Sequence, residues 1–493
     1  MQAGTRQGGP GNRRRSALGL GAVAITVAAL LGAPALAAQA APQANPVITI
    51  DPTQTTTSLN ANSEGLSIEA SDLAIPSFGS GNLAQYLKTL GSSVLRVGGN
   101  TVDESFWTST GETPPSWSQA TITPADLTKL ANLANASGWK VILGVNLKQY
   151  DTARAADEAA HAEQTLGSAL QAIEIGNEPD FYYSSTSTYY TAFEAYSKAI
   201  EAAAPGVAIE GTDTSQSPTG SFETGFVDNE QAHPDVTELT SHYYPLSACS
   251  SGSNPTIAQL LGTTTRDNEK ATADAMVTAA AKLNVPGVLD EGNSVVCEGQ
   301  NGVSNVFASA LWEIDDQLVT AREGVAGDYM HSTVVLCNGP KPLYMYYTPI
   351  CAPTTADANE GNVAAQPEYY GLALVHQIGT GRFANLDNPA WADVRAYAVV
   401  NGGTMKVILD NVDDPASNGA TTLTLDLGAT YTSGTREDLT ASGLTATTGI
   451  TLGGQTVAAG GTIAPPTTTP VSVNGSTMSV TINPASAAII TLS

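Results

Sequence analysis

The sequence predicts an α/β fold in two parts: a (β/α)8 TIM barrel followed by an antiparallel β-sandwich. Between Gly65 and Met330, short apolar runs alternate with helical stretches, which is typical of βα units and a parallel sheet. After about Pro367 the sequence changes to Thr, Gly, Val and Ala with a period of two and loses the helical period, which is typical of strands. The 493 residues also exceed the ~250 to 300 at which one hydrophobic core stops growing. We therefore expect at least two domains.

Eight apolar runs are the expected barrel strands. They are residues 65–70, 93–97, 140–146, 172–176, 207–211, 238–243, 287–290 and 324–329. Helical intervals, in which apolar residues recur three and four positions apart, cover 124–136, 155–170, 189–203, 266–283 and 306–320. Eight βα repeats suit a TIM barrel, and we assign it to residues 61–365.

The sandwich is assigned to residues 366–493. Residues 404–409 and 471–473 alternate in hydrophobicity, and the turn signals Asn401-Gly402 and Asn474-Gly475 separate such runs. A further apolar strand at 47–50 lies within residues 41–60. We expect this N-terminal strand to pair with the C-terminal sheet.

Residues 1–40 have the form of a secretory signal peptide. Three arginines at 13–15 precede an apolar run over 17–31, and two small-x-small sequences follow at 35–37 and 38–40. The alternative is a membrane anchor, but the apolar run falls short of the ~20 residues that a span needs. We expect cleavage near residues 37–41, and a secreted, extracellular protein with no membrane span.

Composition narrows the class of partner. With 42% hydrophobic and 13% charged residues, the chain can bury a core, unlike a disordered sequence. Beyond residue 40 it carries 16 basic and 46 acidic side chains, a net charge of −30. Such a field repels polyanions, so we expect no nucleic acid, anionic membrane surface or sulfated glycan as a partner. The sequence leaves the oligomeric state open.

The four cysteines indicate disulfides. Cys249, Cys297, Cys337 and Cys351 do not have the spacing of a zinc motif, and an even number in an oxidising compartment indicates two disulfides with three pairings open. We favour Cys249 with Cys297 and Cys337 with Cys351, because each pair falls in neighbouring loops of the expected barrel.

Two strand ends carry the candidate catalytic carboxylates. In a TIM barrel the reactive side chains follow the carboxyl ends of the strands. Glu178 follows the fourth expected strand, between Asn177 and Pro179, and Glu291 follows the seventh. A residue before proline favours extended backbone, which would present Glu178 to the site and leave Asn177 to bond a sugar hydroxyl. Two carboxylates with separated pKa values can act as acid and nucleophile, as glycosidic cleavage requires.

With these motifs the chain resembles glycoside hydrolase family 79, a family of the clan whose barrels carry catalytic Glu residues on strands four and seven. The similar stretches are residues 65–70, 95–103, 174–182, 241–245, 291–294, 302–312, 346–349 and 367–371. The Asn-Glu-Pro motif alone is typical of the clan. The Arg-x-Gly-Gly-Asn stretch at 96–100 and the stretch that ends in Ala-Leu-Trp at 310–312 point to the family.

The resemblance implies a retaining mechanism that needs no cofactor and no metal. Glu178 would be the general acid/base and Glu291 the nucleophile, with the two carboxyl groups about 5 to 5.5 Å apart. Tyr243 would hydrogen-bond the nucleophile; the alternative is a core tyrosine. In glucuronide-cleaving members, backbone amides after the nucleophile hold the sugar carboxylate, together with a tyrosine after strand eight.

In this chain the corresponding positions differ from the family pattern. The amide positions are Cys297, Glu298 and Gly299 instead of a Gly-Gly context, and the Glu298 side chain would repel a uronate unless it points to solvent. Tyr347 matches the tyrosine best, with Tyr346 as the alternative.

Further polar residues are candidates for the sugar site. A buried Arg96 would be costly unless it pairs with an acid such as Glu291 or Glu69, and we favour a role in tuning the nucleophile over an ordinary barrel ion pair. His242 and His331 are either pocket walls or structural histidines. The strand-end residues that either line the sugar site or are simply solvated are Asn100, Asp103, Asn146 and Lys148.

We therefore expect an exo-acting β-glucuronidase that releases terminal glucuronic acid or its 4-O-methyl form from a carbohydrate or glycoside substrate. One alternative keeps the barrel and both glutamates but takes a neutral sugar such as glucose, xylose or galactose. Another is a non-catalytic carbohydrate-binding protein. The presence of both Glu178 and Glu291 in their motifs counts against the last alternative.

Overall fold

The structure is a computed structural model of the chain. It describes residues 45–493 except 216, 233–234, 338–344 and 390–393. The predicted signal peptide, residues 1–40, lies outside the described residues. Within the described part, no helix has the length and apolar character needed to cross a membrane.

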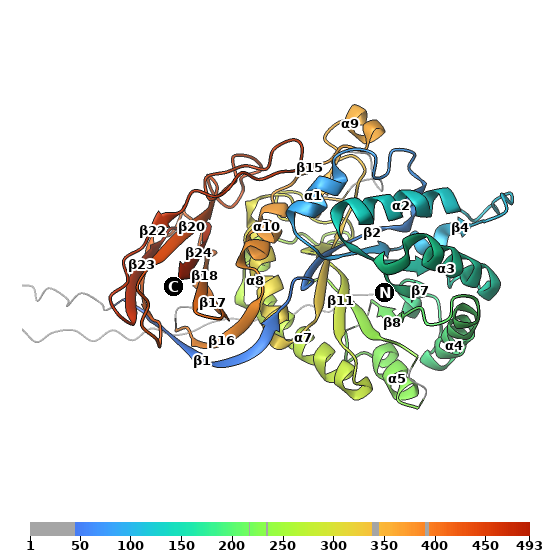
Figure 1. Cartoon of the computed structure of the whole chain (residues 1–493), viewed down its shortest axis with the longest axis horizontal. Helices are drawn as coiled ribbons and strands as arrows, with labels where there is room; N and C mark the ends of the chain where they lie inside the picture. Colours follow the sequence, from blue (N-terminus) through green and yellow to red (C-terminus); the bar gives the residue numbers. More distant parts are fainter. Residues whose placement is uncertain (1–44, 216, 233–234, 338–344, 390–393) are drawn as a thin grey trace, which may run out of the picture. The chain divides into compact units, whose positions relative to one another are not determined.

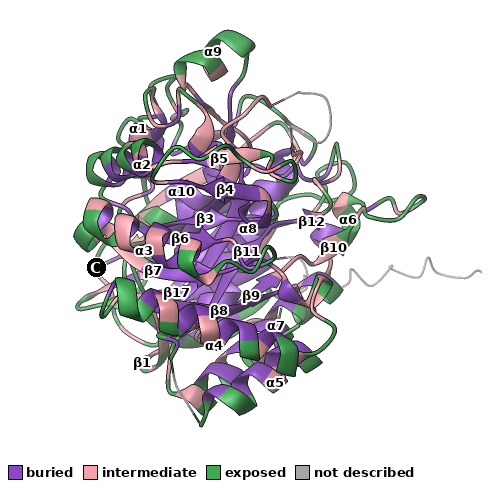
Figure 2. Ribbon diagram, turned by 90° about the vertical axis from the view of Figure 1, so that its right-hand side faces the viewer, coloured by how far each residue is buried: buried purple, intermediate pink, exposed green. Residues whose placement is uncertain are grey.

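Eight parallel strands close a barrel in which each strand pairs with its neighbours in chain order. They are β2 (Glu64–Glu69), β3 (Val94–Gly98), β6 (Lys140–Val145), β7 (Leu170–Ile175), β8 (Ile209–Thr214), β9 (Glu238–Tyr243), β11 (Gly287–Gly292) and β13 (Gly327–Ser332). Figure 2 shows these strands buried inside a ring of helices with exposed outer faces. The predicted TIM barrel is confirmed.

The strand boundaries shift where polar residues end a strand. β8 begins two residues later than predicted and extends to Thr214, and β13 begins three residues later and extends to Ser332. All six residues of each strand are buried. Apolar periodicity cannot detect strand ends whose buried side chains are polar, and these ends belong to the candidate site described below.

The helices around the barrel are α1 (Leu83–Thr89), α2 (Pro124–Ser137), α3 (Thr152–Leu166), α4 (Thr186–Ala203), α5 (Ser221–Glu230), α6 (Ile257–Leu260), α7 (Thr263–Leu283) and α8 (Phe307–Glu323). α2 shows why such segments begin and end where they do. Thr123 and Asp126 form a capping box, Pro124 fills the first turn, and Gly138 ends the helix in a left-handed conformation.

Short elements decorate the carboxyl end of the barrel. The segment after β3 holds the 3-10 turn η2 (Val102–Glu104) and the paired strands β4 (Ser105–Trp107) and β5 (Ala120–Ile122). β10 (Leu246–Ser247), after β9, pairs with β12 (Val295–Val296), after β11. After β13 come the paired strands β14 (Ile350–Cys351) and β15 (Ala364–Ala365), with the short helix α9 (Thr355–Glu360) between them.

The C-terminal domain is built on a ten-stranded sheet. Its strands are β1 (Val47–Leu59), β16 (Gly381–Asp387), β17 (Val394–Asn401), β18 (Thr404–Asn411), β19 (Thr421–Asp426), β20 (Gly434–Thr440), β21 (Thr451–Leu452), β22 (Thr469–Pro470), β23 (Thr477–Ile482) and β24 (Ser486–Leu492). β1 pairs antiparallel with β16 and parallel with β19. The sheet is therefore mixed, where we predicted an antiparallel one.

A helix also lies in the segment where we predicted only strands. α10 (Tyr369–Ile378) is buried on nearly every side, including Leu372, Leu374 and Val375. A helix buried all round shows apolar residues at almost every position, so the amphipathic period that we looked for is missing and the prediction of no helix beyond Pro367 is wrong. α10 packs against α8.

The sandwich and the barrel share a packed boundary. α8 contacts β1 and β18, and α10 contacts β21 (Figure 1). The backbone N–H groups of Phe307 and Ala308, which no residue of their own helix can accept, donate to the carbonyls of Ala446 and Leu444 in the sandwich, at 2.8 and 2.9 Å. The C-terminal domain thus caps the helix that precedes the last barrel strand.

Candidate active site

Glu291 lies in β11 with only 7% of its side chain exposed. Arg96 Nη1 donates to Glu291 Oε2 at 2.7 Å, and the Tyr244 hydroxyl donates to Oε1 at 3.0 Å. Burial alone would raise the pKa of Glu291, but His331, His242 and Arg96 outweigh it and hold the pKa well below its usual range. Glu291 is therefore an ionised carboxylate.

Glu178 lies just after β7, and its backbone differs from our prediction. Instead of the extended conformation favoured before proline, Glu178 has φ 46° and ψ 56°, in the left-handed region. Its N–H donates to the Asp213 carbonyl at 2.8 Å, so a contact with the neighbouring strand β8 stabilises a conformation that the local rule disfavours. Burial raises the pKa of Glu178, and although His242 opposes this, the neighbouring Glu291 and Asp213 add to it.

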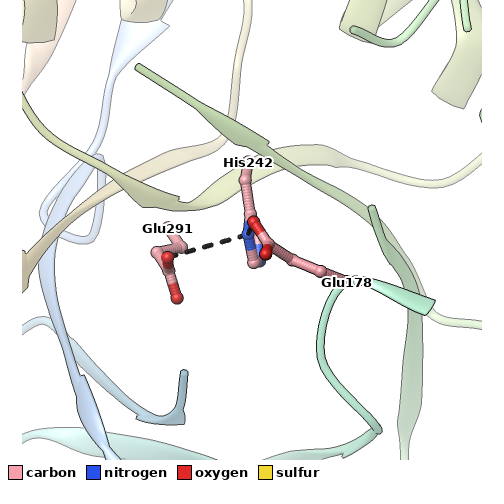
Figure 3. Close-up of side chains that lie close together, drawn as sticks. All are labelled: Glu178, His242 and Glu291. Carbon is pink, nitrogen blue, oxygen red and sulfur yellow. Dashed lines mark hydrogen bonds and ion pairs between the residues drawn. The ribbon is translucent and has the colours of Figure 1, made fainter. Parts of the chain in front are cut away.

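His242 lies between the two glutamates (Figure 3). Its Nδ1 is 3.0 Å from Glu178 Oε1 and 3.7 Å from Glu291 Oε1. One oxygen of each glutamate lies within 4.8 Å of the other. Burial lowers the pKa of His242, but Glu291 and Asp213 more than compensate and raise it well above its usual value. His242 thus contacts both glutamates and favours a negative charge on each of them.

Arg96 is the centre of the polar layer beneath these residues. It is fully buried and donates to Glu174 from Nε at 2.6 Å and from Nη2 at 2.9 Å. Nη2 also donates to Asn177 Oδ1 and Asp213 Oδ1, each at 2.9 Å. The predicted acid partner Glu291 is bound, whereas the other suggested partner, Glu69, accepts instead from the Thr101 hydroxyl at 2.6 Å.

Asp213, on β8, completes the support of His242. Its Oδ1 lies 2.8 Å from His242 Nε2, and although burial raises its pKa, Arg96 and His242 lower it to about 2. The neighbouring Asp290 and Glu174 behave in the opposite way, because burial and nearby acids raise their pKa values well above the usual range. The acids of this layer thus differ: the pKa of Asp213 is lowered, whereas the pKa values of Asp290 and Glu174 are raised.

Two groups in this layer have the composition of a cation site. The ligand atoms of Asp213, His242 and Asp290 lie within 4.8 Å of one another, as do those of Glu174, Glu210 and Asp290. The Arg96 guanidinium already pairs with Glu174, Asp213 and Asp290. Arg96 thus already neutralises the negative charge that would bind a cation. The acids of this layer instead hold Arg96 in place through ion pairs.

Tyr244, and not Tyr243, hydrogen-bonds Glu291, so our prediction for Tyr243 is wrong. Successive side chains of a strand point to opposite faces. His242 points into the barrel, so Tyr243 points outward, where it is half-buried near Glu269 of α7. Tyr244, just beyond the end of β9, returns to the interior and contacts Tyr347 with ring centroids 5.7 Å apart.

His331 and Tyr347 lie on the β13 side of the site. His331 Nδ1 is 3.0 Å from the Ser67 hydroxyl and 3.7 Å from Glu291 Oε2. The rings of His331 and Tyr347 are 6.1 Å apart, and both residues are buried. Tyr347 therefore packs beside Tyr244 and His331, the neighbours of Glu291, whereas Tyr346 uses its backbone N–H to bond the Glu298 carbonyl at 2.7 Å.

The remaining candidates have mixed positions. Asn100 is exposed. Asp103 is buried and accepts the backbone N–H groups of Leu147 and Lys148, each at 3.0 Å, so it fixes the loop after β6. Asn146 donates to the Ser105 carbonyl at 3.1 Å. The exposed Lys148 lies 5.7 Å from the centre of the Tyr182 ring.

In the turn after β12, not every backbone N–H group is free to bind a sugar carboxylate. Cys297, Glu298 and Gly299 all have positive φ, at 66°, 67° and 78°. The Gly299 N–H donates to the Val295 carbonyl at 3.1 Å, so this amide is already used within the turn. Glu298 is half-buried and contributes to raising the pKa of Tyr347, after burial and Glu291.

Both favoured disulfides are present. Cys249 pairs with Cys297, which joins the segments after β9 and β11, and Cys337 pairs with Cys351. Residues that sequence reasoning missed are Tyr244, Asp213, Glu174, Ser67 and Asp290. A signal existed for Tyr244, in strand alternation, and for Asp213, in the polar end of the fifth strand.

Comparison with known proteins agrees with this geometry. The glycosyl hydrolase family 79 C-terminal beta domain matches residues 396–489. The chain therefore carries a C-terminal domain of the glycoside hydrolase family 79 type. The predicted resemblance is thus confirmed, although the matched residues do not include the glutamates of the barrel.

Comparison with individual proteins extends beyond this domain. A β-glucuronidase from Aspergillus niger is 29% identical over 132 residues, which are 26% of this chain and 22% of the relative. A 4-O-α-L-rhamnosyl-β-D-glucuronidase from Fusarium oxysporum 12S shares the fold, with a TM-score of 0.74 and 22% identity over 90% of this chain and all of that one. A family 51 arabinofuranosidase from Xanthomonas axonopodis pv. citri also shares the fold, with a TM-score of 0.65 and 14% identity over 91% of this chain and all of that one.

Proposed function

We propose that the chain is a retaining glycoside hydrolase, an exo-acting β-glucuronidase that releases terminal glucuronic acid or its 4-O-methyl form. The observation that carries the proposal is the pair Glu178 and Glu291. Their oxygens lie within 4.8 Å of each other, which fits the short separation of retaining enzymes and not the ~6.5 to 9.5 Å of inverting ones. Their pKa values shift in opposite directions, as an acid and a nucleophile require.

The reaction follows from these two states. In the first step a Glu291 oxygen attacks the anomeric carbon while the bond to the leaving oxygen breaks, and Glu178 gives its proton to that oxygen. In the second step Glu178 takes a proton from water, the water oxygen attacks the anomeric carbon, and the bond to Glu291 breaks. Glu178 ends protonated and Glu291 ionised, as both began.

The surroundings support this division of labour. Arg96 and Tyr244 each donate to Glu291, which keeps it ionised and fixes both of its oxygens. His242 contacts Glu178 and is anchored by Asp213. Glu178 gains and loses a proton during turnover, and His242 beside it is held in place by Asp213. No side chain therefore has to move far during turnover.

A terminal glucuronic acid is the sugar that the relatives favour. The aligned Aspergillus relative is a β-glucuronidase, and Tyr347 lies beside the nucleophile at the position where the resemblance implies a uronate-binding tyrosine. The anionic sugar would also meet cationic groups, because His242, His331 and Arg96 all surround Glu291.

A neutral sugar is the second candidate, and Glu298 is the observation in its favour. This acid is half-buried and acts on Tyr347, and the adjacent Gly299 amide is already bonded. Both facts weaken a uronate site. The barrel, Glu178 and Glu291 would remain the same for either sugar.

The test compares kcat/KM for 4-nitrophenyl β-glucuronide with the β-glucoside, β-galactoside and β-xyloside between about pH 4 and 7. A glucuronide preference of about tenfold or more, roughly 1.4 kcal/mol in the transition state, supports the proposal. Preference for a neutral sugar selects the second candidate. Absence of turnover on all four substrates contradicts both and favours a binding protein. Release of a single terminal sugar from an oligosaccharide tests exo action.

We also propose that the protein is secreted. The sequence of residues 1–40 and the two disulfides support export to an oxidising compartment. N-terminal sequencing of the protein in the culture medium should give a start near residues 38–41. Retention of the whole protein inside the cell would contradict this.

A further inference from the structure

A second pocket lies on the carboxyl-end face of the barrel, outside the residues around Glu178 and Glu291. It encloses about 260 Å³ between the segment after β3, the loop after β6 and the start of α3. Asn146, the first residue beyond β6, lines it and ties its two sides together by donating to the Ser105 carbonyl. Since drug-sized ligands fill ~300 to 1,000 Å³, this pocket suits a group of about one ring.

Aromatic rings form much of its wall. Trp117 is 36% exposed, and its ring meets the Phe106 ring edge-on with centroids 6.0 Å apart. Trp107 also lines the pocket and is fixed from behind, because its Nε1 donates to Asp157 at 2.7 Å. The Trp117 ring is thus partly open to solvent, and a rigid aromatic surface offers stacking area to a ligand.

Glu158 supplies an unpartnered polar group in the same pocket. It lines the cavity, is only 7% exposed, and makes no hydrogen bond or ion pair with the described residues. Its carboxyl group borders the cavity without a described protein partner, so it can form a hydrogen bond to a ligand there. Burial, together with the neighbouring Asp157, raises the pKa of Glu158 to about 8. Near neutral pH it is thus a hydroxyl donor and not an anion.

The charged residues of the pocket neutralise one another. Arg154 lines the wall, stacks 4.3 Å above the Phe106 ring, and pairs with Glu112 at 2.8 Å and Asp151 at 3.1 Å. An anionic ligand would meet these acids and the net charge of −30 that the chain carries beyond residue 40, whereas a cation would meet Arg154. A neutral ligand with one apolar face and several hydroxyl groups matches the lining best.

We propose that this pocket binds one ring of a neutral saccharide, with Trp117 against its apolar face and Glu158 hydrogen-bonded to a hydroxyl group. The site is distinct from the catalytic pair. Binding there does not depend on the proposed hydrolysis, and it would hold a neighbouring part of a carbohydrate on the same face of the barrel.

The test is a titration of the full chain carrying Glu291→Gln, which suppresses turnover, with xylobiose, cellobiose and β-1,6-galactobiose by ligand-observed NMR. Digalacturonate serves as the anionic comparison. We expect at least one neutral disaccharide to bind with a Kd of about 1 to 10 mM. In the same background, Trp117→Ala should weaken it by about tenfold or more, with circular dichroism confirming the fold.

Two substitutions of Glu158 test whether its side chain donates a hydrogen bond to the ligand. Glu158→Leu should weaken binding by about tenfold, whereas Glu158→Gln, which keeps a neutral donor, should stay within about threefold. Matched controls are Glu163→Leu, exposed on the same helix, and Tyr150→Ala, an exposed aromatic residue outside the pocket. Neither should change the Kd. Three results would overturn the proposal: no binding of any neutral disaccharide, binding by Trp117→Ala and Glu158→Leu as tight as by the Glu291→Gln parent, or tighter binding of digalacturonate that Trp117→Ala weakens.

Discussion

Glu178 and Glu291 are the same side chain in two electrostatic environments. Both are largely buried, so desolvation raises both pKa values. Glu291 has three cationic neighbours, Arg96 at 2.7 Å and His242 and His331 each at 3.7 Å. Among the described residues, the cationic side chain that pairs with Glu178 is His242 alone. The number of cations, and not the degree of burial, therefore decides which glutamate remains ionised.

Replacing Glu291 should remove the nucleophile. We expect Glu291→Ala to lower kcat on 4-nitrophenyl β-glucuronide by at least about 10³-fold, because no covalent intermediate can form. The variant should still fold, which circular dichroism checks, since His242 and Arg96 keep Asp213 as a partner. Turnover within about tenfold of the wild-type protein would assign the nucleophile to another group.

Replacing Glu178 should give a different signature. Protonation of the leaving oxygen matters most when that oxygen is basic. Glu178→Gln should therefore slow glycosides of poorly acidic alcohols far more than those of activated phenols. The measurement is kcat/KM across aryl glycosides of increasing leaving-group pKa, where the slope should steepen. An equal loss on all leaving groups would argue against the acid/base role.

At the scale of elements, what the sequence predicts depends on periodicity. Apolar runs locate the barrel strands, and the rule that reactive side chains follow strand ends locates both glutamates. The same approach misses Asp213, because the polar end of β8 has no apolar signal. It also misses α10, which is apolar on nearly all sides. The left-handed backbone of Glu178 depends on a hydrogen bond to the next strand, which no local preference contains.

The two disulfides offer a comparison at this scale. Cys249–Cys297 closes a separation of 48 residues and Cys337–Cys351 one of 14. By loop-closure entropy they restrict the unfolded chain by about 4 and about 3 kcal/mol. Replacing both cysteines of the first pair by serine should therefore lower the free energy of unfolding about 1 kcal/mol more than the same change in the second.

Chemical denaturation of the two double-serine variants measures this difference. Cys249–Cys297 also braces the turn that contains Glu298, next to the strand of Glu291. We therefore expect its loss to raise KM as well. An unchanged KM together with equal stability losses would show that the bridge constrains neither the turn nor the unfolded chain as we infer.

At the scale of the whole molecule, Asp315 joins the two domains. This buried residue of α8 pairs with Arg395 of β17 at 3.1 Å and accepts the Tyr397 hydroxyl at 2.5 Å. On the barrel side it pairs with Arg266 at 3.0 Å. Asp315→Ala removes the buried carboxylate with which Arg395 and Arg266 pair, and should cost about 3 to 5 kcal/mol in the free energy of unfolding.

An exposed ion pair provides the control for Asp315. Asp274 pairs with Lys270 at 2.8 Å, with about half of each side chain exposed, and Asp274→Ala should cost about 0 to 1 kcal/mol. Denaturant unfolding of both variants measures the contrast. If Asp315→Ala were as mild as the control, the boundary between the domains would depend on apolar packing alone.

Buried acids across both the barrel and its boundary should make the protein most stable in mild acid. Burial raises the pKa values of several carboxyl groups: to about 6 for Asp103, about 7 for Asp72 and Asp328, and about 8 for Glu158, Glu223, Glu269 and Glu368. In the unfolded chain such groups titrate near pH 4. Between these values the folded state binds more protons than the unfolded state, so stability falls as pH rises.

The stabilising contribution of these acids is complete below about pH 4 and is lost as pH rises through about 6 to 8. Asp213 and Glu291, whose pKa values are lowered, have the opposite effect, but only below about pH 4. We expect the denaturation midpoint to fall steadily from about pH 5 to about pH 8. Glu223→Gln should make the free energy of unfolding fall less steeply with pH, by up to about 1.4 kcal/mol per pH unit. Glu163→Gln, at an exposed site, should leave this slope unchanged. A denaturation midpoint that rises over this range would contradict the prediction, because it would mean that the buried acids are ionised in the folded protein.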